Sequence, residues 1–507
     1  MGTDTSPLHA EPVGAFFTPS KWADFCVHRF GLVREWLSGA SVCDPTAGIG
    51  SFLFALCDQA LTAGRTLSPD LLCNLYFIEK EPDYVSQFQE TFLCRYGIPF
   101  PHTNVHVHDV ILDPPDFRVD ILVGNPPWAN FSDLRSEYKK ILKPHFLSAG
   151  LVVDSQDLLL GSSRIDLAAL VVETCMDRLL RDNGKAVFIL PMSMFQNDGA
   201  HAGFRRYLLP DGSPFALREI LDFNGQRIFD GVRTRFGVAF LEKNAVTQYP
   251  VPYSILDDGI WLEKCATPFP CDTSPLSVHG SDETPRDFLS EISFNLREDQ
   301  KPRQGVNTCG ANQVFIFETV PDFIPEELLY PLADRSSFQF DEKTTDPNRY
   351  IFLPHDRISG KPLAQDVLQS RFPDAWRYLQ DNREFLLNRK GTLIASWKNR
   401  GFWWALLGVG PYSYAPYKVM WEAYGARTFR PMIFGQYQDQ PWQGNQALHA
   451  YIPCRTHLEA ETVKISLSHP SVQEFLEASR TQGTCNWAQP GRIKQIIRFR
   501  KPQLDLF

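Results

Sequence analysis

The sequence lacks paired cysteines, a signal peptide and a long apolar run. Its eleven cysteines never form a CxxC pair, and no apolar stretch reaches the ~18 residues that a membrane-spanning helix needs. These absences argue against a secreted disulfide framework and against a membrane protein. We therefore expect a reduced, cytoplasmic protein with no membrane partner.

A glycine is also missing where a dinucleotide-binding protein would have one. The segment DPTAGIGSF (44–52) contains Gly48 and Gly50, but position 53 is Leu, where the GxGxxG fingerprint requires its third glycine. Glycines at 48 and 50 still allow a tight backbone turn. The sequence thus disfavours a nicotinamide-dependent dehydrogenase and leaves a different nucleotide-like ligand open.

The size and charge of the chain predict two domains with different roles. With 507 residues, 43% of them hydrophobic, the chain can bury more than one core. Its net charge is −9, yet residues 381–507 carry 16 Lys and Arg against 9 Asp and Glu, an excess of +7. Such a split fits an acidic enzyme body with a basic region for a polyanion, although a solvated basic face would give the same count.

The N-terminal half has the rhythm of an α/β protein. Helical patterns at 50–64 and 165–184 alternate with short apolar runs, and these runs are 40–44, 71–79, 104–109, 119–125 and 184–191. This alternation predicts a doubly wound sheet, in which ligands bind beyond the carboxyl ends of the strands.

Polar side chains follow four of these predicted strands. They are Asp44, Glu79, Asp109 and Asn125. Glu79 is placed to accept from the ribose hydroxyls of a nucleoside, and Asp109 is placed to accept from an adenine amino group. Each one alone is typical of a helix cap, but four at successive strand ends favour a ligand site.

The stretch VGNPPWAN (123–130) places two prolines and a tryptophan beside an amide. Pro126 and Pro127 remove two backbone donors and fix φ, so the loop is rigid and its carbonyls stay free to accept. The Asn125 side-chain oxygen and the Pro126 carbonyl could together hold an NH2 group and make its nitrogen more nucleophilic as a transition state forms. Trp128 could stack on the ring that carries the amine.

With these motifs the sequence resembles the N6-adenine DNA methyltransferases of restriction-modification systems, in the class with a C-terminal target-recognition domain. GAFFTP (14–19) and DPTAGIGSF resemble the cofactor segments, and RIFDGVRTRFGVAFLE (227–242) resembles the strand that carries a second aromatic residue. The resemblance implies catalytic roles for Asn125, Pro126, Pro127, Trp128 and Phe229. It implies S-adenosylmethionine contacts at Phe17, Thr18, Asp44, Thr46, Ala47, Gly48, Gly50, Glu79, Lys80, Asp109, Val110 and Asn125.

The resemblance also implies the architecture. We expect a seven-stranded, Rossmann-like methyltransferase sheet over residues 1–250, a connecting segment over 251–294, and an α+β DNA-recognition domain over 295–507. The connecting segment includes the Pro-, Ser- and Asp-rich stretch 267–285. Two positions depart from the family pattern, because Trp128 stands where Tyr is commoner and Thr46 where a small residue or Cys is commoner. Neither change removes a required group.

The implied function is methylation of a flipped-out adenine in duplex DNA, by a protein that is a monomer on DNA. GAFFTP begins at residue 14, so we expect a modification enzyme without its own nuclease, encoded beside separate restriction or phage-defence subunits. Two alternatives stay open. One is a glutamine N5 protein methyltransferase or a guanine N2 ribosomal RNA methyltransferase, and the other is a catalytically inactive DNA-binding subunit.

Two further clusters of residues are explained by structural roles and do not require a functional one. PHTNVHVHD (101–109) invites a metal site, but its alternation with valine favours a strand with one buried face, and methyl transfer requires no metal. The aromatic segment 402–421 is more readily explained as core than as a DNA-facing cleft. We therefore expect no functional metal.

Overall fold

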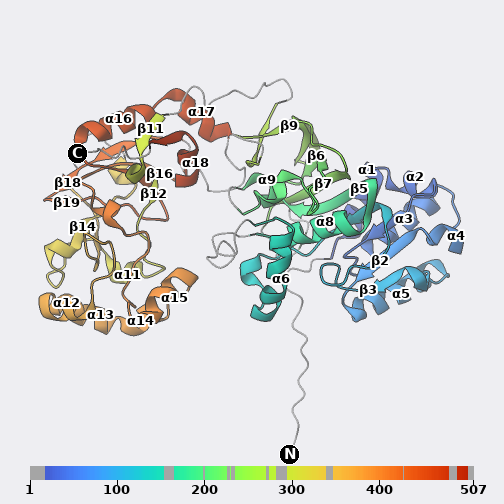
Figure 1. The fold of residues 1–507 in the computed structure, drawn as a ribbon, viewed down its shortest axis with the longest axis horizontal. Helices are drawn as coiled ribbons and strands as arrows, with labels where there is room; N and C mark the ends of the chain where they lie inside the picture. Colours follow the sequence, from blue (N-terminus) through green and yellow to red (C-terminus); the bar gives the residue numbers. More distant parts are fainter. Residues whose placement is uncertain are drawn as a thin grey trace, which may run out of the picture. The chain divides into compact units, whose positions relative to one another are not determined.

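The structure is a computed structural model that describes residues 17–152, 165–197, 200–224, 226, 229, 234–269, 273–280, 294–338, 346–425, 428–478 and 488–500. The chain divides into two compact units, Met1–Thr284 (unit 1) and Pro285–Phe507 (unit 2). In Figure 1 the colours run from blue to green through unit 1 and from yellow to red through unit 2.

Unit 1 is built on one ten-stranded mixed sheet. In spatial order its strands are β10 (Leu276–His279), β9 (Ile260–Pro268), β8 (Val251–Asp257), β6 (Phe215–Asp222), β7 (Phe236–Lys243), β5 (Leu180–Pro191), β4 (Val119–Gly124), β1 (Val42–Asp44), β2 (Leu75–Glu79) and β3 (Val105–Val107). Strands β3, β2, β1, β4 and β5 pair in parallel, whereas β7 runs antiparallel between β5 and β6. The predicted α/β fold is confirmed, and the first seven strands have the order 3-2-1-4-5-7-6.

The run predicted as a strand over 71–79 begins later than expected. Residues Pro69–Leu72 instead form the short helix α4. The Ser68 hydroxyl caps this helix by accepting from the Leu71 N–H at 3.3 Å, and Pro69 occupies its first position, where a missing N–H costs nothing. The strand therefore starts only at Leu75.

The segment 251–294 is not a linker over its first part, which corrects the predicted boundary. Strands β8, β9 and β10 lie between 251 and 279 and extend the sheet beyond β6. Hairpin β8–β9 turns through Asp258 and Gly259, which have φ of +44° and +82°. An Asp-Gly pair with both φ positive is typical of the two-residue turn of a β-hairpin. The sequence therefore indicates a hairpin here, in a segment whose proline-rich part predicts a linker.

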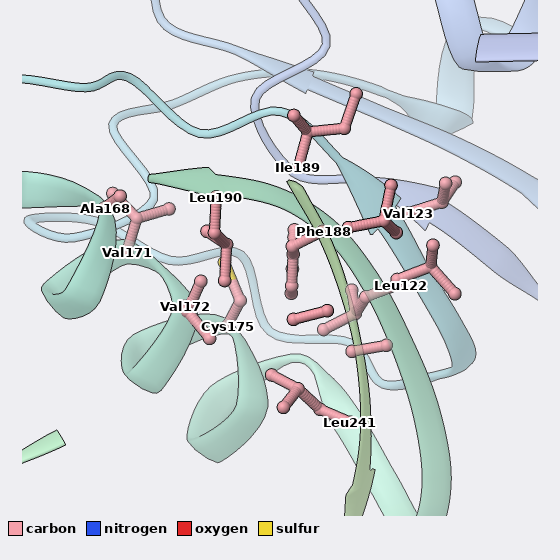
Figure 2. Close-up of a cluster of buried hydrophobic side chains, with 14 of the residues drawn as sticks. Leu122, Val123, Ala168, Val171, Val172, Cys175, Phe188, Ile189, Leu190 and Leu241 are labelled. Carbon is pink, nitrogen blue, oxygen red and sulfur yellow. The ribbon is translucent and has the colours of Figure 1, made fainter. Parts of the chain in front are cut away.

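Helices cover the sheet and bury its apolar strands. In the described residues of unit 1 the helices are α1 (Ser20–Arg29), α2 (Leu32–Leu37), α3 (Ser51–Thr62), α4, α5 (Pro82–Tyr96), α6 (Ser136–Ser148), α8 (Leu167–Arg178) and α9 (Ser193–Gln196). Figure 2 shows side chains of α8, including Val172 and Cys175, gathered beside Phe188 and Leu190 of β5, while Ile189 lies on the other side of that strand. Strands covered on both faces read as continuous apolar runs, which is the pattern that the sequence shows.

Unit 2 is an α+β unit with several small sheets. Its strands are β11 (Phe294–Arg297) with β21 (Ile497–Arg500), the sheet of β12 (Arg303–Gln304), β20 (His449–Cys454), β16 (Tyr417–Glu422) and β17 (Met432–Phe434), the sheet of β13 (Ile316–Phe317), β15 (Tyr350–Phe352) and β14 (Leu329–Pro331), and β18 (Gln436–Tyr437) with β19 (Gln440–Pro441). Its helices are α11 (Asn312–Phe315), α12 (Gln365–Arg371), α13 (Pro373–Asp381), α14 (Arg383–Leu387), α15 (Thr392–Asn399), α16 (His457–Leu467), α17 (Pro470–Ala478) and α18 (Pro490–Gln495).

The aromatic segment 402–421 contributes mainly to the core of unit 2, as the sequence favours. Trp404 and Trp421 are fully buried, at 1% and 0% exposure. Some of the basic residues of this unit are also internal. Arg389 donates to the carbonyls of Thr308 and Trp403 at 3.0 and 2.6 Å, and the Lys418 ammonium donates to two further carbonyls. These buried cations do not contribute to a surface for a polyanion.

Candidate functional site

The carboxyl ends of β1, β2, β3 and β4 meet along one edge of the sheet in unit 1. Because these strands are parallel and adjacent, with Asp44 beside Phe77 of β2 and Cys43 beside Leu122 of β4, the residues that follow them share this edge. The four polar residues predicted at strand ends are thereby brought to one edge of the sheet.

Asp44 ends β1 and is almost fully buried, at 1% exposure. Its Oδ1 accepts from the Thr46 N–H at 3.2 Å, and burial raises the carboxyl pKa well above its usual range. The next strand comes very close, because a Cβ built on Gly124 would lie 2.9 Å from Asp44 Oδ1. Only glycine at 124 therefore lets the end of β4, and the Asn125 that follows, lie against this carboxyl group.

The loop after β1 turns through two glycines with left-handed backbone. Gly48 and Gly50 have φ of +54° and +87°, and Gly50 precedes the first residue of α3. A Cβ on Gly50 would lie 2.3 Å from the Phe88 ring of α5. These glycines permit a close turn whose backbone N–H groups lie at the start of a helix, as the predicted cofactor loop requires.

Phe17 lies beside this loop, and Thr18 follows Phe17 in the sequence. The Phe17 ring is 46% exposed, stands 3.1 Å from the position that a Gly48 Cβ would take, and packs edge-on to Tyr84 with ring centroids 5.0 Å apart. Thr18 is buried at 7% exposure. The structure thus brings Phe17 of the GAFFTP segment next to the glycine loop; residues 14–16 of that segment lie outside the described residues.

Glu79, at the end of β2, is held by backbone donors. Its Oε2 accepts from the Gly48 N–H at 2.8 Å, and its Oε1 accepts from the N–H groups of Lys80 and Glu81 at 2.8 and 3.0 Å. Burial raises the pKa of this carboxyl group, and the three hydrogen bonds oppose that rise. A carboxylate can accept roughly four hydrogen bonds, and the three backbone donors use three of these positions. One ribose hydroxyl can therefore bind without breaking a hydrogen bond, whereas binding two hydroxyls would displace a backbone donor.

Asp109 follows β3 and contacts a residue that the sequence did not single out. Its Oδ1 accepts from two backbone N–H groups of the following turn at 3.0 and 3.3 Å, and its Oδ2 accepts from the Tyr138 hydroxyl of α6 at 3.1 Å. The Lys80 ammonium lies 5.7 Å from the centre of the Tyr138 ring, and Val110 is buried at 5% exposure. Tyr138 therefore joins the predicted residues Lys80 and Asp109 in one cluster, although no motif marks it in the sequence.

The Asn125–Trp128 loop leaves β4 at the same edge. Asn125 and Pro127 are half-buried, and Pro126 and Trp128 are buried. The indole Nε1 of Trp128 donates to the Ile189 carbonyl of the neighbouring strand β5 at 3.4 Å. This hydrogen bond attaches the loop to the sheet through Trp128.

The residues after this loop pair with the start of α8. The Leu167 N–H donates to the Ala129 carbonyl and the Phe131 N–H to the Ile165 carbonyl, each at 2.8 Å. Asp166, between the two, caps α8 by accepting from the Ala168 N–H at 3.0 Å, and its burial raises the pKa to about 7. Asp166 is a second residue that the sequence analysis passed over, although an Asp before an apolar helical run is a known start signal.

Trp128 and Phe229 lie together, but not as parallel plates. Their ring centroids are 5.1 Å apart with planes at 85°, and Phe236 at the start of β7 packs 5.1 Å from Trp128 and 4.9 Å from Phe229. A base between parallel rings needs about 7 Å, twice the ~3.5 Å contact distance of aromatic carbons. In this structure the two predicted stacking residues therefore contact each other, and one ring must move before a base can enter.

The histidine segment does not form a metal centre. His108 bonds through Nδ1 to Asp113 Oδ2 at 2.7 Å, and His106 packs against the Phe117 ring. Among the described residues, no group of three or more His, Cys, Asp or Glu side chains could hold a metal ion. None of the helices in the described part of the chain has the length and hydropathy to cross a membrane.

The comparisons with known proteins agree with this geometry. Residues 86–229, which contain β4 and the Asn125–Trp128 loop, match the family model of the Eco57I restriction-modification methylases. The Type II methyltransferase M.HincII of Haemophilus influenzae is 25% identical over 223 residues, and the alignment covers 43% of this chain and 35% of that protein. The Type II methyltransferase M.NspV of Nostoc sp. is 29% identical over 119 residues, or 23% of each chain. The matched part of this chain thus spans about a third of the M.HincII length.

Two solved structures share the fold. The Type IIL restriction-modification enzyme MmeI, solved in complex with DNA, has a TM-score of 0.54 at 12% identity and covers 93% of this chain and 65% of its own. The Type ISP restriction-modification enzyme LlaBIII, solved bound to DNA, has a TM-score of 0.50 at 14% identity and covers 88% of this chain and 34% of its own. The family match and the curated relatives confirm the resemblance predicted from the motifs, which is to the methyltransferases of restriction-modification systems.

Proposed function

We propose that the protein is a site-specific DNA methyltransferase that transfers a methyl group from S-adenosylmethionine to the N6 amine of adenine. The observation that carries this proposal is the placement of the Asn-Pro-Pro-Trp loop directly after Gly124, whose missing side chain lets the loop start against Asp44. The loop lies at the edge of the sheet where Glu79 and the Gly48 backbone lie, and this position supports a role in binding the amine.

The side chains at this edge suit the proposed cofactor. Glu79 has room for a ribose hydroxyl, and the Asp109 carboxylate can accept from an adenine amino group. Phe17, which lies beside the glycine loop, and the following Thr18 are proposed for the methionine part. We extend the same proposal to Asp44, Thr46, Ala47, Gly50, Lys80 and Val110 as residues that line the cofactor site. When bound, S-adenosylmethionine supplies an electrophilic methyl group on its sulfonium.

The role of the chain is to present a nucleophilic amine. The target adenine leaves the duplex, because its amino group is otherwise enclosed in the base-pair stack. The Asn125 side-chain oxygen and the Pro126 carbonyl accept from the two amine hydrogens, which keeps the lone pair on nitrogen as the new bond forms. Pro127 keeps the loop rigid, and Trp128 and Phe229 contact the base after one of these rings has moved.

Unit 2 is the proposed reader of the DNA sequence, and the protein is proposed to act as a monomer on DNA beside separately encoded restriction or defence subunits. The basic excess of residues 381–507 supports this DNA-reading role of unit 2, and the basic residues buried inside the unit reduce the positive charge available at its surface.

The direct test offers labelled S-adenosylmethionine and three acceptors: duplex DNA, a release factor and ribosomal RNA. The proposal expects N6-methyladenine in DNA only. Label in the protein or RNA would support the glutamine or guanine alternative, and DNA binding with no transfer to any acceptor would support an inactive subunit. Sequencing the host genome for N6-methyladenine, with and without the gene, then gives the recognition site.

A further inference from the structure

A buried ion pair lies beside the aromatic residues of the proposed target-base pocket. Asp222, the last residue of β6, has a side chain at 0% exposure, and the Arg235 side chain is 14% exposed. Arg235 Nε donates to Asp222 Oδ1 at 2.9 Å and a terminal guanidinium nitrogen donates to Oδ2 at 2.6 Å. This two-point contact fixes the guanidinium plane as well as its position.

The same carboxylate has two further partners. The Asn224 N–H donates to Asp222 Oδ1 at 2.8 Å, and the hydroxyl of the buried Tyr253 of β8 donates to Oδ2. Tyr253 in turn accepts from the Gln196 amide at 2.5 Å. Asp222 is thus the centre of a hydrogen-bonded cluster that joins β6, β8, α9 and the residue that precedes β7.

The Asp222 cluster includes one residue from each side of Phe229 in the sequence. Asn224 and Arg235 lie on either side of Phe229 in the sequence, and both bind the Asp222 carboxylate. The Arg235 carbonyl also accepts from the Met192 N–H at 2.9 Å. One buried side chain therefore sets the separation of the two ends of this segment.

The neighbours of the two paired residues are aromatic and reach the pocket. Phe236 follows Arg235 and packs 5.1 Å from Trp128, and Phe223 follows Asp222 and packs 5.6 Å from Phe236. A shift of Arg235 would therefore move a ring that contacts Trp128. A buried ion pair does not by itself show a stabilising role, because apolar residues of the same volume often stabilise a fold equally well. The presence of this pair beside the pocket therefore suggests a role other than stability.

We propose that Asp222 is a positioning residue, which acts through Arg235 and Asn224 to hold Phe229 and Phe236 in place around Trp128. This inference rests on the proposed function, because the pocket it shapes is the one proposed for the flipped adenine. In this proposal Asp222 has no direct contact with base or cofactor; it sets the geometry of Phe229 and Phe236.

The chain offers a matched control on the same two strands. Arg218, in the middle of β6, and Glu242, near the end of β7, also form an Arg–carboxylate pair, with Nε and Oε2 2.7 Å apart. This pair is about one-third exposed and has no aromatic pocket residue in sequence beside it. Glu242→Gln therefore removes a charge from the same β6–β7 ladder without touching the Asp222 cluster.

The experiment compares the wild type with Asp222→Asn, Tyr253→Phe and Glu242→Gln in the full chain. Four quantities are measured: the single-turnover methylation rate on duplex DNA, the fluorescence of 2-aminopurine at the target base, S-adenosylmethionine affinity, and amide hydrogen exchange over residues 223–236. We expect Asp222→Asn to slow methylation roughly tenfold or more and to lower base-flipping fluorescence, because small displacements of positioning groups are costly. Cofactor affinity should stay within about twofold, since the cofactor residues are untouched.

Exchange over 223–236 should quicken in Asp222→Asn and remain at the wild-type rate in Glu242→Gln. Tyr253→Phe, which removes one hydroxyl and keeps the ring, should fall between them and covers the case in which Asp222→Asn does not fold. Equal exchange and equal methylation in Asp222→Asn and wild type would overturn the inference, as would a loss of cofactor affinity in step with the loss of rate. Wild-type protein that methylates no adenine would refute the proposed function instead, and the exchange measurement would then decide the positioning role by itself.

Discussion

At the scale of single residues, the site depends on small groups that allow close approach. Gly124 is the clearest case, because its missing Cβ leaves room for the Asp44 carboxyl group between β1 and β4. Asn125 follows directly, so its position depends on how closely Gly124 and Asp44 fit together.

Gly124→Ala should therefore displace residues of the site and lower the stability of the fold. The added methyl would lie 2.9 Å from Asp44 Oδ1 and 3.4 Å from the Pro45 ring, so the end of β4 must shift. We expect a loss of roughly 1 to 3 kcal/mol in the free energy of unfolding, which is the usual cost of overpacking. Chemical denaturation measures it, and an alanine variant as stable and as active as wild type would contradict the close contact.

Trp128→Ala should weaken binding of the target base before the reaction. A stacking platform contacts the base during flipping as well as during transfer, and base–aromatic stacking is worth roughly 1 to 3 kcal/mol. We expect lower 2-aminopurine fluorescence and a raised Kd for DNA with the target base, while Trp128→Phe retains most of both. Unchanged flipping in the alanine variant would count against the stacking role.

At the scale of elements, much of unit 1 could be predicted, because apolar runs and helical periodicity are local properties. Strand β4 (Val119–Gly124) lies where the apolar run 119–125 indicates. Helix α8 ends at Arg178, earlier than the predicted end at 184, because β5 (Leu180–Pro191) already begins at Leu180. The sequence-based prediction lacks strands β8 to β10 because the stretch 267–285 is rich in Pro, Ser and Asp, although the Asp258–Gly259 pair is typical of a hairpin turn. Tyr138 could not be predicted, because its contact with Asp109 joins α6 to the end of β3 and no local pattern encodes such a pairing.

Asp166 links an element to the site, and its ionisation should change stability with pH. Burial raises its pKa to about 7, so between roughly pH 4, the unfolded value, and pH 7 the folded protein keeps a proton that the unfolded chain has lost. The favourable contribution is complete below about pH 4 and is lost as the pH rises through about 7.

Asp166→Asn should lack this dependence, because asparagine resembles the protonated form and still caps the helix. The difference in unfolding free energy between variant and wild type should grow in favour of the variant between about pH 4 and 8, by on the order of a few kcal/mol. Urea denaturation of both proteins across this range measures it, and a constant difference would show that Asp166 is ionised throughout.

At the scale of the whole molecule, the chain divides into a unit that contains the proposed cofactor residues and a more basic unit. All the proposed cofactor residues lie in Met1–Thr284, and the basic excess lies in Pro285–Phe507. The charge count predicted this separation, but it could not predict that Arg389 and Lys418 are buried, because burial depends on tertiary packing.

A fragment ending at residue 284 should keep S-adenosylmethionine affinity and lose specific DNA binding. A fragment ending at residue 265 should be less stable, because it cuts β9 (Ile260–Pro268) and removes β10, which pairs with β9. Calorimetry, gel shifts and thermal unfolding compare the two fragments. Specific DNA binding by the 284-residue fragment at full strength would contradict the proposed role of unit 2.

The central claim is that the Asn125 side chain acts on the amine during methyl transfer, and one measurement tests it most directly. Single-turnover formation of N6-methyladenine in duplex DNA is compared between wild type and Asn125→Ala, with S-adenosylmethionine affinity measured on the same samples. The account predicts a rate lower by about 10²-fold or more, the scale of losing one placed hydrogen-bond partner, with cofactor affinity little changed because Glu79 and Asp109 are intact. Methylation by Asn125→Ala at the wild-type rate would contradict the account.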